Sequence, residues 1–198
     1  MTRPELQVGR VLRSSTRSFT IGCAVMQPDI PAFGSFVRAN GPTDNSLIYG
    51  LIYDVSTQDD LFVRQFITAD TPDEVVLDQR RNRQVPIEVS ILTVGCGDGE
   101  TIRQCLPPQP PVTLDWLYVC SNEEIERFTA RTDFFRLVLE ARDAPTDELL
   151  AACLRIAAAV RPEHAQRPFL IEAGRELARL LAADPMRLEG LLLRLRSW

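Results

Sequence analysis

The chain contains no lysine, and it has a single histidine, His164, among its 198 residues. The absence of lysine excludes mechanisms that need a flexible ammonium group, such as Schiff-base chemistry, a Walker-type phosphate site or the catalytic site of a protein kinase. One histidine leaves few means for acid–base catalysis or metal binding. We therefore expect a protein without enzymatic activity, and we assign no catalytic, cofactor-binding or metal-binding residue.

Long apolar runs are also missing from the sequence. The longest helical apolar stretch, residues 149–160, is interrupted by Arg155 and is shorter than the roughly 20 residues that cross a bilayer. Residues 1–5 carry charges of both signs and no apolar segment follows a basic start, so we expect no secretory signal. The five cysteines are widely spaced and odd in number, which indicates free thiols in a reducing, cytoplasmic setting.

The residues that are present divide the chain into two parts. The overall composition, 45% hydrophobic and 25% charged with a net charge of −5, is typical of a globular protein. Residues 1–120 consist of short β-rich runs separated by glycine and proline, whereas residues 121–198 are rich in leucine, alanine, arginine and glutamate at helical spacing. This change predicts an α+β fold, with a small antiparallel β-barrel or a β-sandwich over residues 1–120 and an α-helical bundle over residues 121–198.

The strands of the first part follow from alternating apolar and polar residues between turn residues. The run Ile87–Val94 shows this alternation through much of its length, as expected for a strand that is buried on one face. The predicted strands are Gln7–Ser14, Ser18–Met26, Ser35–Ala39, Leu47–Ser56, Leu61–Ile67, Pro86–Gly95 and Leu114–Cys120.

The second part contains signals for five helices. Ser121 and Glu124 have the spacing of a capping box, which predicts a helix over Asn122–Phe128. Thr132 is the predicted cap of the next helix, and a third carries an apolar stripe between residues 149 and 160. The fourth is predicted from about Pro168 to Ala183, and the fifth begins at Asp184 and Pro185.

The strand blocks, taken in order over residues 6–126, resemble the HAS barrel of HerA-type translocases and ATP synthase catalytic-ring subunits. The blocks that carry the resemblance are Val8–Val11, Phe33–Val37, Ile48–Val55, Pro86–Gly95, Pro107–Val112 and Leu117–Glu124. In the proteins it resembles, the barrel organises subunits in a ring and contacts partner proteins. The P-loop motif of the HerA-type ATPases is absent, and a chain without lysine cannot supply it.

Two regions are candidate partner-binding surfaces. The first is the basic cluster Arg80, Arg81 and Arg83, which suits an acidic partner or nucleic acid. Several acidic residues precede it, so a solvated loop is the favoured interpretation. The second is the last predicted helix, which carries apolar residues on two faces. Its candidate contact residues are Met186, Arg187, Leu193, Arg194 and Trp198. Three interpretations of this helix remain open: contact with a partner or a second copy, packing within the bundle, and contact with a membrane surface.

Together these features favour a non-enzymatic assembly or adaptor protein that binds a protein partner or a multisubunit complex, with self-association as a further alternative. A second hypothesis is an accessory subunit of a DNA-processing translocase or nuclease complex, without an active site of its own. Direct binding to nucleic acid is not expected, because acidic residues outnumber arginines in both parts of the chain.

Overall fold

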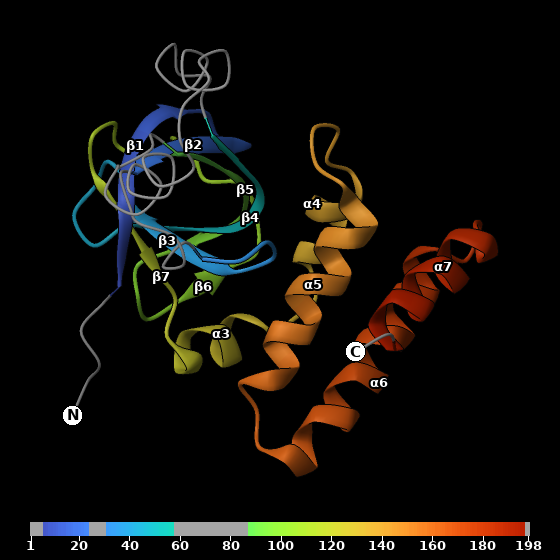
Figure 1. Cartoon of the computed structure of the whole chain (residues 1–198). Coiled ribbons are helices and arrows are strands. Elements are labelled where there is room, and N and C mark those ends of the chain that lie inside the picture. Colours follow the sequence, from blue (N-terminus) through green and yellow to red (C-terminus); the bar gives the residue numbers. More distant parts are fainter. Residues whose placement is uncertain (1–5, 24–30, 58–86, 197–198) are drawn as a thin grey trace, which may run out of the picture.

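A computed structural model describes residues 6–23, 31–57 and 87–196, and it shows an α+β fold in which a closed antiparallel β-barrel lies beside five helices (Figure 1). The strands are β1 (Gln7–Ser14), β2 (Ser18–Cys23), β3 (Phe36–Asn40), β4 (Leu47–Thr57), β5 (Ile87–Gly97), β6 (Ile102–Arg103) and β7 (Trp116–Val119). The helices are α3 (Asn122–Phe128), α4 (Phe134–Leu139), α5 (Thr146–Ala159), α6 (Glu163–Leu180) and α7 (Pro185–Arg196).

Six strands form the barrel in the order β2-β1-β7-β3-β4-β5, and β5 pairs with β2 to close it. The β2–β5 pairing runs without interruption from Ser18 opposite Leu92 to Cys23 opposite Ile87. The far end of β5 pairs instead with the short strand β6. Closure leaves no long free strand edge among the described strands, so a partner cannot readily bind to the barrel by adding a strand.

Two hydrophobic cores explain the sequence pattern of the strands. One core fills the barrel and includes Val37, Ile52 and Ile91. The other lies outside the barrel, where alternate residues of β3, β4 and β5 such as Phe36 and Leu92 pack against the helices. The second half of β5 is therefore buried on both faces, whereas the sequence pattern predicted burial on one face.

An aromatic cluster joins the outer face of the barrel to the first two helices. Phe128 of α3 lies with its ring centroid 5.4 Å from that of Tyr49 and 5.8 Å from that of Phe36. Phe134 of α4 lies 5.3 Å from Phe128 and 4.9 Å from Phe135, in edge-to-face geometry. Such pairs add to the stabilisation from buried area, so the outer face of the barrel and the helices share one of the two cores.

Helix α5 lies between the barrel side of the molecule and the outer helices α6 and α7 (Figure 1). It is buried on several sides, including both Leu149 and Leu150, because it packs against α4, α6 and α7 and also contacts β4. The single apolar stripe predicted for this helix is therefore only part of its buried surface.

Gly34 permits the close approach of the barrel to α5. Its φ of +85° is a left-handed conformation that favours glycine. A Cβ atom at this position would lie 2.6 Å from Cβ of Ala152 and 3.0 Å from the backbone nitrogen of Cys153. The segment is fixed to the barrel by the Gly34 amide, which donates to the Ile52 carbonyl.

Most predicted elements are present in the described ranges. β1 and α3 have the predicted bounds, and the Ser121–Glu124 capping box is formed. Strand β6 was not predicted, since two residues are too short to show a periodicity. The predicted strand Leu61–Ile67 and residues 24–26 of the second strand lie outside the described residues.

Two predicted helix starts were wrong. Thr132 does not cap α4; the N-cap residue is Asp133, whose side chain makes no capping hydrogen bond. Helix α6 begins at Glu163, so that His164 lies in its first turn and Pro168 lies inside the helix. The preceding residues hold this early start in place, because Arg161 stacks over the Phe169 ring at 3.8 Å and its carbonyl accepts from the Gln166 side chain.

Candidate functional site

A hollow lies where the barrel meets α4 and the segment that leads to α5, and we call it the junction groove. It has a volume of about 550 Å³. Its lining residues come from both parts of the fold: Arg17, Ser18, Tyr53, Leu92, Thr93, Leu106, Leu137, Glu140, Ala141, Arg142, Asp143 and Ala144.

Local features of the strands and helices create the junction groove. The register between β4 and β5 shifts after Ile52, so Tyr53 has no opposite residue and lies half-buried at the groove. Leu106 follows β6 and is 39% exposed, which leaves an apolar contact point on the groove. Helix α4 ends at Leu139, and the chain then turns over the groove before α5 begins.

The charges of the junction groove are mixed. Arg17 and Arg142 are exposed, as are Glu140 and Asp143. Two positive and two negative side chains give no excess of positive potential, which a phosphate backbone would require. Apolar patches between charges of both signs suit a segment of polypeptide instead.

Thr93 adds a polar group at the base of this region. Its backbone amide donates to the Arg17 carbonyl at 2.9 Å and thereby fixes the start of β2 against β5. Its side chain is 1% exposed, and the hydroxyl has no hydrogen-bond partner among the described residues.

Helix α7 carries the candidate contact residues that the structure describes. Leu191 is buried, and Leu188 and Leu195 pack on the same core, so one apolar face of the helix is turned inward. Met186 and Leu193 are 77% and 54% exposed. The two apolar faces therefore exist: one packs on the core, and the other is exposed.

The arginines of α7 make contacts within the molecule. Arg187 donates to Asp147 at 2.9 Å and to the Thr146 hydroxyl at 2.8 Å, and the hydrogen bond to Asp147 raises the pKa of Arg187. Arg194 forms an ion pair with Glu148. Both carboxylates lie in the first turn of α5, so these arginines attach α7 to the start of that helix. Arg80, Arg81, Arg83 and Trp198 lie outside the described residues.

Two polar links between the barrel and the helices were missed by the sequence analysis. Arg38 of β3 forms a largely buried ion pair with Glu124 of α3 at 2.8 Å. Glu124 also accepts from the Ser121 amide, so one carboxylate caps α3 and joins it to the barrel. An arginine inside the apolar strand β3 is the signal that could have indicated this buried pair.

Gln104 makes the second link. Its side-chain amide donates to the Phe128 carbonyl at 2.6 Å and to the Arg131 carbonyl at 3.0 Å, and its side-chain oxygen accepts from the Phe134 amide at 3.0 Å. One side chain thereby binds the end of α3, the α3–α4 connection and the start of α4 to the chain after β6. No sequence motif identifies such a bridge, because it depends on where the backbone groups meet.

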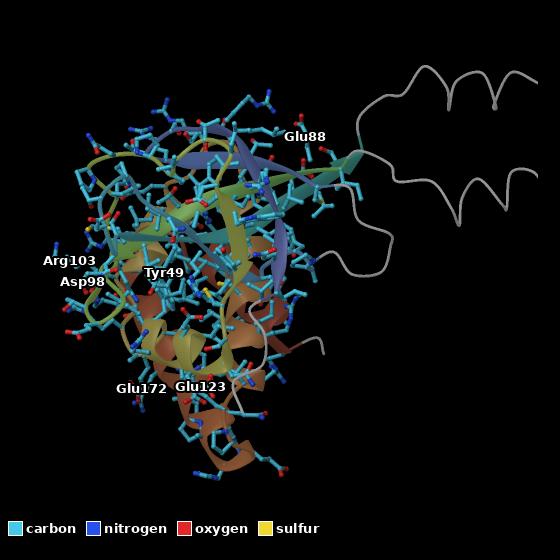
Figure 2. All side chains as sticks on the ribbon, turned by 90° about the vertical axis from the view of Figure 1, so that its left-hand side faces the viewer. Tyr49, Glu88, Asp98, Arg103, Glu123 and Glu172 are labelled. Carbon is cyan, nitrogen blue, oxygen red and sulfur yellow. The ribbon has the colours of Figure 1, made fainter. Side chains whose placement is uncertain are left out.

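Three acidic residues lie on different elements of the described structure: Glu88 on β5, Glu123 on α3 and Glu172 on α6. Figure 2 shows Glu88 far from Glu123 and Glu172. Glu123 is at the start of α3, where its backbone amide lowers its pKa. Glu172 forms an ion pair with Arg175.

The described ranges contain no group of three or more histidine, cysteine or acidic side chains arranged to hold a metal ion. Nor does any described helix combine the length and the apolar character of a membrane span. Comparison with known proteins finds no family model that matches the chain and no curated protein that matches its sequence.

Proposed function

We propose that the protein is a non-enzymatic adaptor that binds a partner protein through the junction groove and the exposed face of α7. The observation that carries this proposal is the junction groove itself, because its walls come from both the barrel and the helices and combine apolar surface with charges of both signs. A HAS-barrel-like domain followed by a helical bundle is the finer description that we propose for the fold. The order of the strand blocks supports it.

The barrel favours binding through side chains. Because the strands of the barrel are already paired with one another, a partner has to bind to the groove or to the faces of the helices. Leu106 and Leu137 supply apolar contacts in the groove, while the exposed side chains of Met186 and Leu193 supply a second contact area on α7. Large apolar side chains in hollowed, partly polar surroundings are typical of the residues that dominate protein interfaces.

A site-specific crosslinking experiment tests this proposal. A photoreactive amino acid is placed at Leu106, at Met186 and, as a control, at the exposed His164 on α6, and the full chain is irradiated in its host. Crosslinks to one protein from positions 106 and 186 but not from 164 are expected. Equal crosslinking from all three positions, or none, contradicts the proposal.

The partner identified in this way is then purified for a binding titration. Leu106→Asp is expected to weaken binding by about 10- to 100-fold, since loss of an apolar interface contact commonly costs 1–3 kcal/mol. His164→Asp is expected to leave the affinity unchanged. Crosslinks to a second copy of the chain would indicate self-association, and crosslinks to DNA would favour the accessory-subunit hypothesis instead.

A further inference from the structure

Two cysteines meet at the end of the barrel that carries the β5–β6 hairpin. The Sγ atoms of Cys96 and Cys105 are 3.9 Å apart. Cys96 lies on β5 opposite Arg103 of β6, and Cys105 is two residues beyond that pair. The other cysteines, Cys23, Cys120 and Cys153, are buried elsewhere in the two cores, so only one pair of thiols is brought together.

The hairpin between the two cysteines is well held. The Asp98 side chain accepts from the amides of Glu100 and Thr101 at 3.1 and 2.7 Å, and Gly99 adopts a φ of +88°. Figure 2 shows Asp98 and Arg103 close together at this end of the barrel. The turn therefore fixes the pairing of Cys96 with Arg103 and places Cys105 beside Cys96, where the sulfur separation of 3.9 Å has to shorten to about 2.0 Å for a disulfide bond to form.

The two thiols differ in their access to solvent. Cys105 is exposed and can meet a small oxidant, whereas Cys96 is half-buried. Burial and the neighbouring Cys105 raise the pKa of Cys96 to about 11. Cys105 is therefore the thiol that reacts first, and Cys96 is placed to complete the exchange.

The position of Cys105 connects this pair to the rest of the fold. The preceding residue, Gln104, binds the Phe128 and Arg131 carbonyls and the Phe134 amide. A covalent bond from Cys105 to β5 would reduce the freedom of the backbone that presents Gln104. The α3–α4 connection would then be held more firmly against the barrel.

We propose that Cys96 and Cys105 form a reversible disulfide that fixes the segment after β6 to β5 and so strengthens the attachment of α3 and α4 to the barrel. The oxidant is a low-molecular-weight disulfide such as oxidised glutathione. The Cys105 thiolate attacks one of its sulfur atoms, which forms a mixed disulfide and releases one thiol. The Cys96 thiolate then attacks the Cys105 sulfur and expels the second thiol. The two protein thiols lose two electrons, and their two protons end on the released thiols.

The first test follows the thiols of the full chain in buffers of reduced and oxidised glutathione. Under oxidising conditions the protein is expected to lose two hydrogen atoms in mass, and peptide mapping is expected to join Cys96 to Cys105 and to leave Cys23, Cys120 and Cys153 as thiols. In Cys96→Ala, Cys105 is expected to stop at the mixed disulfide with glutathione. Persistence of that mixed disulfide in the unsubstituted chain, or free thiols at every buffer ratio, overturns the proposal.

The second test measures the attachment of the helices by hydrogen exchange. The Phe134 amide, which donates to Gln104, is expected to exchange at least about tenfold more slowly after oxidation. This slowing requires only a modest share of the stabilisation that a disulfide commonly supplies. Cys96→Ala exposed to the same buffer provides the control and is expected to show no such slowing. An unchanged Phe134 rate in a chain whose disulfide has formed refutes the strengthened attachment.

Discussion

The contact between Gly34 and α5 provides a sharp test of how the barrel and the helices are joined. A Cβ at position 34 would lie 2.6 Å from Cβ of Ala152, a distance at which one of the two backbones has to move. Gly34→Ala also adopts an unfavourable left-handed conformation, which costs about 1–2 kcal/mol. Overpacking adds about 1–3 kcal/mol, so we expect a total loss of about 3 kcal/mol in the free energy of unfolding.

Gly99→Ala is the matched control. Gly99 has nearly the same φ, +88°, but the nearest atom to an added Cβ is Cδ1 of Leu47 at 3.8 Å, an ordinary contact. This variant should therefore lose only about 1–2 kcal/mol, from the backbone conformation alone. The difference between the two variants measures the cost of crowding between the barrel and α5.

Urea unfolding followed by tryptophan fluorescence measures both losses. Ala152→Gly in the Gly34→Ala background removes the nearest atom, so the double variant is expected to be less destabilised than the sum of the single variants by about 1 kcal/mol or more. If Gly34→Ala and Gly99→Ala lose the same free energy, or if the double variant is strictly additive, then α5 does not press against the barrel at this point.

Three further predictions concern the polar contacts. Gln104→Ala is expected to lower the free energy of unfolding by about 2–3 kcal/mol, because three hydrogen bonds are lost. The control Gln109→Ala, at an exposed position, is expected to change the free energy of unfolding little. Equal unfolding midpoints for the two variants would contradict the bridging role of Gln104. A double-mutant cycle on Arg187 and Asp147 is expected to give a coupling of about 0.5–1 kcal/mol, and a coupling of zero would show that this pair does not attach α7 to α5. Hydrogen bonds from the turn amides lower the pKa of Asp98, so the stability that this carboxylate contributes is present above the unfolded-state pKa and is lost as the pH falls through the folded-state pKa. The difference in unfolding midpoint between Asp98→Ala and the unsubstituted chain should therefore shrink over that pH range. A difference that stays constant with pH would exclude this role of the carboxylate.

The sequence predicted the elements whose signals are local. The capping box at Ser121 and Glu124 marks the start of α3, and Asp184, which accepts from the Arg187 amide, marks the start of α7. These signals were sufficient because a helix start is decided by hydrogen bonds over three or four residues. Pro168 was misleading, since the residues around Arg161 and Phe169 hold an earlier start to α6.

The candidate site was less accessible to sequence reasoning. Met186 and Leu193 could be placed on an exposed helix face by their spacing alone. The contacts of Arg187 and Arg194 could not be predicted, because their carboxylate partners are 40 and 46 residues away along the chain. The junction groove has the same origin: Arg17, Leu106 and Arg142 line one hollow only because the barrel and the helices fold against each other.

The sequence by itself determined which kinds of chemistry are excluded and where most strands and helices lie. A chain without lysine cannot supply a lysine-dependent mechanism in any fold, and short-range periodicity is a property of neighbouring residues. Only the tertiary structure decided that β5 closes the barrel on β2, that Gln104 bridges to α3 and α4, and that the Cys96 and Cys105 thiols meet. These features depend on the free energy of long-range packing, because residues far apart in the chain have to fill the same buried space and supply the hydrogen bonds of the same buried polar groups.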